Sequence, residues 1–495
     1  MPHFDILIVG NGVIGLSSAY ALMLEDPTLR IGILGPSTPC GDASSASGAM
    51  LGCFGEVTSS SFNTTIGRTK LEMSIKSATM WPNWLQKIND LTPYDEKLSI
   101  NPGTFVLLNS SSGQLDDENY QAIIKALEMY DEPYDKIDPS DIRGINPLPN
   151  YRPLQALFLP NEGSINSLGL LHHLKGIINQ AANITCIDGT AKHLFFSSGE
   201  FHSLETHQGE KIEADGLLIA AGAYSQNLID QVPEIKNKIP RLFYGVGCSI
   251  LIEVPQRKID YVVRTPNRSF ACGLHVVPRD KHTLYIGATN NVELAPETQP
   301  RMALLHFLLQ CALEQIDQGF HNAKVIKWSV GNRPATIDTF PLIGGTSIPN
   351  LWLLTGTYRD GLHCSPLLAS HIAKIILNKN NADEVYNIFH PERNPIQIMS
   401  KDESIEETLK HYMAGAYEHG MKLPRVGWDK MFEELLINKF HSLYHELGID
   451  FSLPPDLLLM FDNDRNKHVS HFKEMIQNNN RSQTSKINTV SLEKN

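Results

Sequence analysis

The first part of the chain alternates apolar runs with a helical stretch in the order strand, helix, strand. Residues 4–9 are almost fully apolar, which is typical of a parallel strand buried on both faces. Residues 13–24 carry a helical pattern, and residues 31–34 form a second short apolar run. Three glycines in the spacing G-x-G-x-x-G join the first strand to the helix: Gly10, Gly12 and Gly15. The pattern predicts a Rossmann-type unit that holds a diphosphate at the helix N-terminus.

Each glycine of this loop has a separate physical role. Gly10 permits the tight turn, Gly12 lets the backbone approach a pyrophosphate, and Gly15 lets the helix pack closely on the strand. The acidic residue that normally binds the ribose is missing, because Gly35 stands at the end of the second strand. Asp42 follows seven residues later and could replace it only through an unusual loop. The missing carboxylate weakens the case for NAD.

The rest of the chain alternates strand and helix signals as far as about residue 380. Residues 217–221 predict a buried strand, residues 241–289 are mostly strands, and residues 301–318 predict a helix. Beyond that point the apolar spacing is helical, and the last twenty or so residues are rich in Asn, Ser and Lys. We expect an α/β fold with α+β elements: a Rossmann-type domain, a mostly antiparallel sheet and a helical C-terminal extension.

Charge and cysteine content narrow the class of protein. The 495 residues include 42 basic and 54 acidic side chains, and the net charge of −12 argues against a nucleic-acid partner or an anionic membrane surface. The seven cysteines are scattered without a CxxC motif, which favours reduced thiols. No apolar run approaches the ~20 residues of a membrane span, and Asp5 stands where a secretory signal needs an apolar core. We therefore expect a soluble, cytoplasmic protein.

Four separated motifs together resemble one family. They are VGNGVIGLSSAYAL near the N-terminus, SSASGAMLG at 44–52, ADGLLIAAGAYS at 214–225, and the pair GNRPATIDTFPLIGG and GTYRDGLHCSPLLA near residue 350. Taken alone, the small residues of the second motif suit either a flexible linker or a backbone lying against a flat ligand. Over roughly residues 3–380 the sequence resembles the FAD-dependent D-amino acid oxidase superfamily, in its glycine oxidase and sarcosine oxidase branch. The diphosphate would then be that of FAD.

The resemblance implies a division of the chain. The FAD-binding domain would be discontinuous and made of residues 1–80, 150–225 and 325–380. The substrate-binding domain would take residues 81–149 and 226–324. The remaining chain has no counterpart in the resemblance, and we expect a helical extension over 381–475 and a disordered tail over 476–495.

The resemblance also implies which residues contact the cofactor. Val13 and Ile14 would lie beneath the pyrophosphate, and Ala191 near the adenine. Relatives in the sarcosine branch attach FAD through a cysteine at about the position of Gly331, so the sequence predicts a non-covalent flavin. The full set of expected FAD contacts is Gly10, Gly12, Val13, Ile14, Gly15, Gly35, Ser44, Ser45, Gly48, Ala49, Met50, Ala191, Gly222, Arg359, Asp360, Gly361 and Leu362.

Two arginines are expected at the substrate. Arg333 matches the residue that pairs with the substrate carboxylate, and Arg359 would be a second cation near it. A guanidinium can hold a planar carboxylate through two charge-assisted hydrogen bonds, although a lone arginine more often makes a structural ion pair. The expected substrate is a small amine or amino acid. Hydride would pass from Cα to flavin N5, the imine would hydrolyse, and dioxygen or another acceptor would reoxidise the flavin.

Two positions depart from the branch. His275 stands where a tyrosine is usual, and Asn290 stands where an apolar residue is common. A neutral histidine could donate one hydrogen bond as tyrosine would, so the change could be drift. Alternatively, both residues bind a substrate larger or more polar than glycine or sarcosine, and His275 could titrate near neutral pH.

The C-terminal extension leaves its role open. His441, His445 and Glu446 have a spacing that metals use, but no further ligand supports it, so we expect a solvated helix face and no metal. A cap on the active site, a homo-oligomer contact or a partner contact would each use these helices. Two alternatives to a free amino acid substrate remain: a carrier-bound amine in a biosynthetic pathway, and a non-catalytic flavin-binding scaffold.

Overall fold

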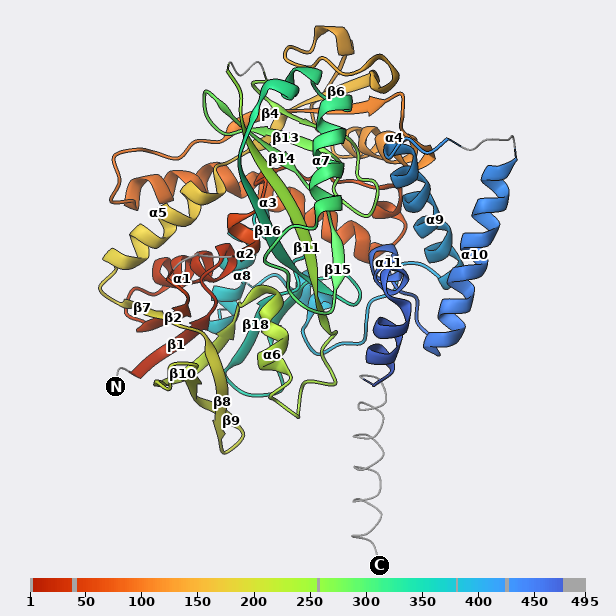
Figure 1. Cartoon of the computed structure of the whole chain (residues 1–495). Coiled ribbons are helices and arrows are strands. Elements are labelled where there is room, and N and C mark those ends of the chain that lie inside the picture. The colour runs from red at the N-terminus through yellow and green to blue at the C-terminus, as the bar shows by residue number, and fades with distance from the viewer. Residues whose placement is uncertain (1–2, 38–41, 256–258, 380–381, 423–426, 475–495) are drawn as a thin grey trace, which may run out of the picture.

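The structure is a computed structural model that describes residues 3–37, 42–255, 259–379, 382–422 and 427–474. Cys40 and the tail expected to be disordered, 476–495, lie outside these residues. Figure 1 shows two sheets, with helices around both and the C-terminal helices along one side. Among the described residues, no helix has the length and apolar character needed to cross a membrane.

The first sheet is the parallel sheet that the N-terminal pattern predicts. Its strands follow the order β17-β18-β10-β1-β2-β7. All neighbours pair in parallel except β17 with β18, and β8 and β9 extend the sheet antiparallel from β10. The strands are β1 (His3–Val9), β2 (Ile31–Gly35), β7 (Ile184–Asp188), β8 (Ala191–Ser197), β9 (Glu200–Thr206), β10 (Lys211–Ile219), β17 (Leu342–Gly345) and β18 (Leu351–Thr355).

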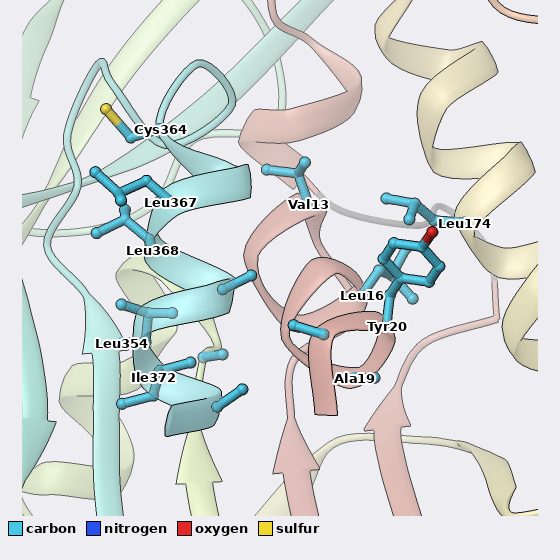
Figure 2. Packing of buried hydrophobic residues seen from close by; sticks show 14 of the residues in the cluster. Val13, Leu16, Ala19, Tyr20, Leu174, Leu354, Cys364, Leu367, Leu368 and Ile372 are labelled. Carbon is cyan, nitrogen blue, oxygen red and sulfur yellow. The ribbon is translucent and has the colours of Figure 1, made fainter. Parts of the chain in front are cut away.

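Helices bury one face of this sheet. The central helix α1 (Val13–Glu25) lies between α5 (Ser167–Gln180) and α8 (Ser365–Ile376). Leu16 and Tyr20 of α1 are buried, and Figure 2 shows them on the side of Leu174 of α5. This packing fixes the N-terminus of α1 at the carboxyl end of β1, where a Rossmann-type site holds its ligand.

The second sheet is mostly antiparallel. Its order is β15-β11-β14-β13-β12-β4-β6-β3, with β16 paired to β11 and β5 to β6. Within the described part of this sheet, only β12 and β4 pair in parallel. The strands are β3 (Met50–Leu51), β4 (Asn101–Asn109), β5 (Asp135–Ile137), β6 (Pro153–Ser164), β11 (Leu242–Glu253), β12 (Val262–Arg264), β13 (His275–Pro278), β14 (Thr283–Gly287), β15 (Asn291–Glu293) and β16 (Lys324–Thr336).

Five further α-helices precede the C-terminal extension in the described part of the chain. They are α2 (Asp42–Ser45), α3 (Thr65–Leu91), α4 (Gln114–Met129), α6 (Ser225–Ile229) and α7 (Met302–Gln315). The parallel sheet, the antiparallel sheet and the helical extension confirm the predicted fold class. Three strands of the second sheet, β3, β6 and nearly all of β16, fall within ranges that the sequence assigned to the FAD-binding domain, so the exact domain boundaries stay a prediction.

The C-terminal extension packs against the second sheet. It contains α9 (Lys401–Glu418), α10 (Trp428–Leu447) and α11 (Pro455–Asn463). Its apolar side chains share one buried cluster with Phe243 of β11 and Val292 of β15. In Figure 1, α11 lies beside β15, between that sheet and α10. The extension is therefore part of the same packed body as the second sheet.

Candidate active site

The glycine loop brings three chain segments into backbone contact. Gly10 has a φ of +115°, and a Cβ there would lie 2.3 Å from the carbonyl oxygen of Ala220. A Cβ on Gly15 would lie 1.9 Å from the carbonyl oxygen of Gly10. Side chains at either position would therefore separate β1, β10 and α1. The first amides of a helix lack intrahelical acceptors and carry its positive end, so this close packing presents an anion site.

One of these amides is already bound by the protein. The Val13 N–H donates to Ser44 Oγ at 3.0 Å, which ties α2 to the start of α1. Ser45 and Ser47 donate to backbone carbonyls of the same turn. The small-residue segment thus forms an ordered wall beside the helix N-terminus, as expected of a backbone that lies against a ligand.

A cavity of about 690 Å³ extends from this loop. Its volume lies within the ~300–1,000 Å³ of small-molecule and cofactor sites. The cavity reaches from Ala191 on β8, at one end, to Arg359 after β18 at the other. The expected FAD contacts that line it are Gly10, Gly12, Val13, Ile14, Gly35, Ser44, Ser45, Ala191, Gly222, Arg359, Gly361 and Leu362.

The end of β2 shows what stands in place of the missing carboxylate. A Cβ on Gly35 would lie 2.4 Å from the side-chain Cγ of Asn11, whose amide nitrogen donates to the Pro36 carbonyl at 2.7 Å. The Asn11 carboxamide therefore fills the space that an acidic side chain at position 35 would need. Asp42 instead accepts from Asn332 at 2.8 Å, so it is held toward β16.

A second cavity of about 90 Å³ adjoins the first. Both cavities are lined by Arg333, Arg359 and Leu362. The predicted residues that line the smaller cavity are Gly48, Ala49, Met50, His275, Arg333, Arg359, Asp360 and Leu362. Gly15 and Asn290 are the predicted residues that line neither cavity. The structure thus brings nearly all predicted residues to one continuous site at the junction of the sheets.

The guanidinium of Arg333 borders both cavities. It lies on β16 opposite Gly245 of β11, and its Nη1 donates to the Thr289 carbonyl and to Asn290 Oδ1, both at 3.2 Å. A Cβ on Gly247 would lie 2.2 Å from Nη1, so this glycine makes space for the guanidinium. In the described part of the chain, Arg333 has no carboxylate partner. Its charge is therefore available to a ligand.

Arg359 differs, because a carboxylate already binds it. Its Nη2 lies 2.7 Å from Asp456 Oδ1 and donates to the Phe270 carbonyl at 2.6 Å. Asn290 connects the two arginines: its Oδ1 accepts from Arg333, and its Nδ2 lies 3.0 Å from Asp456 Oδ1. Asn290 therefore lies behind the arginines and positions them.

His275 lies on β13 with its ring in the wall of the smaller cavity. Its Nδ1 lies 3.2 Å from the Gly273 carbonyl, and the ring stacks on Tyr285 at a centroid distance of 5.8 Å. Burial, together with the nearby cation of Arg264, lowers the pKa of His275 to about 3. The prediction that His275 titrates near neutral pH is therefore wrong. It stands as a neutral hydrogen-bonding group.

The acidic groups around the smaller cavity are paired. Glu56 lies 2.5 Å from Arg264, and Asp360 lies 3.1 Å from Lys70. In the extension, Glu446 pairs with Arg465 at 2.7 Å. Within the described ranges, no group of three or more His, Cys, Asp or Glu side chains could hold a metal ion.

The geometry fits FAD. The glycine loop is a cradle that a Cβ would fill, and the larger cavity links this loop to the two arginines. At Gly331, a Cβ would lie 3.0 Å from the Ala46 side chain and 3.1 Å from Ala43 Cα. A cysteine at that position would need its neighbours to move, which favours a flavin held without a covalent bond.

Several residues of the site were missed by the sequence analysis. Glu56, Cys272 and Tyr285 line the smaller cavity, and Tyr358 lines the larger one. Tyr358 stands within the quoted GTYRDGL motif, so the motif could have indicated it. Asp456 has no such signal, because it follows two prolines after the second predicted helical stretch of the extension.

Comparison with known proteins places this geometry in one family. The family described as DAO, FAD dependent oxidoreductase, matches residues 5–375. The bifunctional protein ThiO/ThiG of Trichormus variabilis is 26% identical over 394 residues, which cover 79% of this chain and 55% of that protein. The glycine oxidase of Geobacillus kaustophilus is 24% identical over 387 residues, covering 77% of this chain and 95% of that enzyme. The chain thus spans about half the length of the bifunctional relatives.

Solved structures show the same fold. The crystal structure of glycine oxidase from Geobacillus kaustophilus has a TM-score of 0.68 at 21% identity, over 80% of this chain and all of that one. The crystal structure of iminodiacetate oxidase from Chelativorans sp. BNC1 has a TM-score of 0.65 at 18% identity, over 79% of this chain and all of that one. The matched shares leave out about a fifth of this chain, a proportion similar to that of the extension.

Proposed function

The chain belongs to the DAO family of FAD-dependent oxidoreductases, and we propose that it oxidises the C–N bond of a small amino acid or secondary amine. The observation that carries the proposal is Arg333, which stands without a carboxylate partner among the described residues where the two cavities meet. A free guanidinium at that point binds a substrate carboxylate through two charge-assisted hydrogen bonds. The larger cavity, which adjoins the smaller one at Arg333, would hold the flavin next to the bound substrate.

The chain's own residues would bind and orient the substrate. Arg333 holds the carboxylate, Asn290 fixes Arg333 from behind, and the neutral His275 offers a hydrogen bond without a competing charge. Ala49 and Met50 form an apolar wall that excludes water. FAD supplies an acceptor for the hydride that leaves Cα, and the resulting imine hydrolyses in water. Much of the rate acceleration would then come from orientation.

The size of the smaller cavity favours a small substrate. Its volume of about 90 Å³ is well below the ~300 Å³ at which sites for drug-sized ligands begin. A carrier-bound amine would need a wider channel to the arginines. The glycine oxidases among the relatives support a small amino acid as well. We therefore propose a free amino acid, and dioxygen or another small acceptor for the electrons.

Anaerobic titration of the FAD-loaded protein tests the proposal. Glycine, sarcosine, proline and D-amino acids are added in turn while absorption near ~450 nm is followed, since hydride uptake bleaches the oxidised flavin. At least one of these amines should bleach the band, and admitting air should show whether dioxygen restores it. Glycolate is the matched control, because it has the carboxylate of glycine and no amine.

Three results would contradict the proposal. A flavin that stays oxidised with every free amine would point to a tailored or carrier-bound substrate. Bleaching by glycolate as efficient as bleaching by glycine would show that the C–N bond is not the bond that reacts. Failure to take up FAD at all would favour a scaffold.

A further inference from the structure

One residue of the C-terminal extension reaches the substrate end of the site. Asp456 stands at the start of α11, and its Oδ1 accepts from Arg359 Nη2 and from the Tyr358 hydroxyl, each at 2.7 Å. The Asp456 and Arg359 side chains are only 15% and 19% exposed. Because both groups are largely shielded from water, their attraction is screened less than that of a surface pair.

The extension is fixed firmly enough to hold Asp456 in place. Three side chains of α11, Leu457, Leu458 and Phe461, are completely buried in the cluster that the extension shares with the second sheet. At the start of the extension, the Ser404 hydroxyl donates to the carbonyl of Leu453, just before α11. The position of Asp456 is therefore set by a packed core.

A loop of the second sheet joins the extension to the site from another side. The Phe270 N–H donates to His411 Nδ1 of α9 at 2.9 Å, while the Phe270 carbonyl accepts from Arg359 at 2.6 Å. The preceding residues are held by a buried ion cluster, in which Arg268 lies 2.7 Å from Asp116 and 2.5 Å from Glu418. Two elements of the extension, α9 and α11, thus support Arg359.

The pairing decides the charge that the smaller cavity offers a ligand. Its carboxylates, Glu56 and Asp360, are paired with cations outside its lining. Of its two arginines, Arg359 is paired with Asp456 and Arg333 is not. The cavity therefore presents one uncompensated positive charge, and it would present two if Asp456 were neutral.

We propose that Asp456 is a specificity-determining residue of the extension, which makes the site select ligands with one carboxylate over ligands with two. The second carboxylate of such a ligand would have to displace Asp456 from Arg359, or it would lie unpaired near Asp456. The second arrangement is unfavourable because two negative charges are then held close together. This inference rests on the proposed function for its substrate class. It does not depend on which amino acid is oxidised.

The test compares the binding of acetate and malonate to the FAD-loaded protein. Both are inert carboxylates that should perturb flavin absorption when they enter the site, and they differ in the second carboxylate. In Asp456→Asn, the ratio of the malonate Kd to the acetate Kd should fall about tenfold, because one new charge-assisted contact becomes available. Malonate should gain affinity while the flavin spectrum without ligand stays unchanged.

Two further variants separate charge from damage to the fold. Asp456→Glu keeps the negative charge and should retain the selectivity of the unsubstituted protein. Asp462→Asn is the matched control on the same helix, since Asp462 is a buried carboxylate that pairs with Lys439 and accepts from Tyr412 at 2.7 Å. It should leave the ratio unchanged, and thermal unfolding of each variant checks that it is folded.

The outcomes separate this inference from the proposed function. An unchanged ratio in Asp456→Asn, or an equal shift in Asp462→Asn, would overturn the role of Asp456 even if amino acids reduce the flavin. A shift confined to Asp456→Asn would support it even if no amine tested were oxidised. If neither acid perturbs the flavin of the unsubstituted protein, the site binds no carboxylate and the inference fails.

Discussion

The larger cavity, which fits FAD, and the smaller cavity, which we propose for the substrate, share part of their lining, yet the chain builds them in different ways. One end of the larger cavity comes from one short stretch of the glycine loop, Gly10 to Ile14, together with the small-residue turn after Asp42. The smaller cavity takes its charges from Arg333 and Arg359, and the partner of Arg359 lies about a hundred residues further on, in the extension. The first cavity depends on local backbone geometry, while the second depends on long-range pairing of charges.

The two regions also use different chemistry to hold a ligand. At the glycine loop, the protein offers helix amides and close backbone contacts, and the carboxylate of the neighbouring turn, Asp42, is bound to Asn332 and Tyr224. Around the smaller cavity, it offers two guanidinium groups. The charge of Arg359 is balanced by Asp456, and Arg333 has no balancing carboxylate among the described residues. Substitutions should therefore act by steric crowding at the first cavity and by changing the charge at the second.

The largest effect should come from crowding the glycine loop. Gly15→Val places a side chain where the Cβ alone would lie 1.9 Å from the Gly10 carbonyl oxygen. Forcing this contact costs about 3 kcal/mol or more in a packed region, and it moves the helix amides away from the ligand. The purified variant should contain no FAD, as measured by absorption and by FAD release after denaturation.

A glycine of the parallel sheet provides the control for this substitution. A Cβ on Gly345 of β17 would lie 3.6 Å from the nearest atom, Trp352 Cδ1, which is ordinary contact. Gly345→Ala should therefore keep its FAD. Retention of FAD by Gly15→Val at the level of Gly345→Ala would show that the loop does not hold the diphosphate.

This contrast explains how much the sequence could predict. The N-terminal strand, glycine loop and helix follow from one contiguous pattern, because strand and helix periodicities are encoded locally. The region of Arg333 follows from the family resemblance. The replacement of the ribose carboxylate could not be predicted, since Asn11 and Gly35 meet only when β1 and β2 pair. The partner of Arg359 could not be predicted either, because Asp456 lies outside the family resemblance.

The positions of two predicted pocket residues needed the structure for the same reason. Asn290 and His275 both looked like polar groups facing a substrate. The structure places Asn290 behind Arg333, and it buries His275 among cations that a sequence pattern does not reveal. Residue type therefore indicated the correct region, while burial and partners decided the role.

A smaller effect, confined to the substrate, is expected at Arg333. Arg333→Met should raise KM for a carboxylate substrate about 10- to 100-fold, since hydrogen bonds to a charged group contribute about 1.5–3 kcal/mol. FAD content should not change. Arg333→Lys keeps the charge but loses the planar fork, so its KM should lie between the two. Steady-state kinetics with the best amine found by titration gives these values.

The Arg333→Met variant also tests whether FAD binding and substrate binding can be lost separately. If Arg333→Met loses FAD together with substrate affinity, the two cavities do not act separately. Unchanged KM in Arg333→Met would remove Arg333 from the substrate site and, with it, the observation on which the proposed function rests.

The smallest expected effect concerns His275 and appears as a pH dependence of stability. Its pKa is lowered from 6.5 to about 3 in the folded protein, mainly by burial. Between pH 3 and pH 6.5 the unfolded chain binds a proton at His275 that the folded protein does not bind. Protonation of His275 in the unfolded chain therefore lowers the free energy of unfolding as the pH falls below 6.5, and it has little effect above that pH. From pH 7 to pH 5 the loss is about 2 kcal/mol.

The variant His275→Gln should lack this loss, because glutamine does not titrate. Its free energy of unfolding in urea should therefore fall by about 2 kcal/mol less than that of the unsubstituted protein between pH 7 and pH 5. His371, buried on α8 with its pKa lowered to about 4 by burial, gives a control away from the arginines. His371→Gln should also reduce the pH dependence of stability, but it should leave acetate binding unchanged. The rate of amine oxidation could instead show an inflection near pH 6.5 that disappears in His275→Gln. That result would mean that His275 titrates near its ordinary pKa in the FAD-loaded protein, so substrate binding would depend on pH as well as on the charges of the arginines.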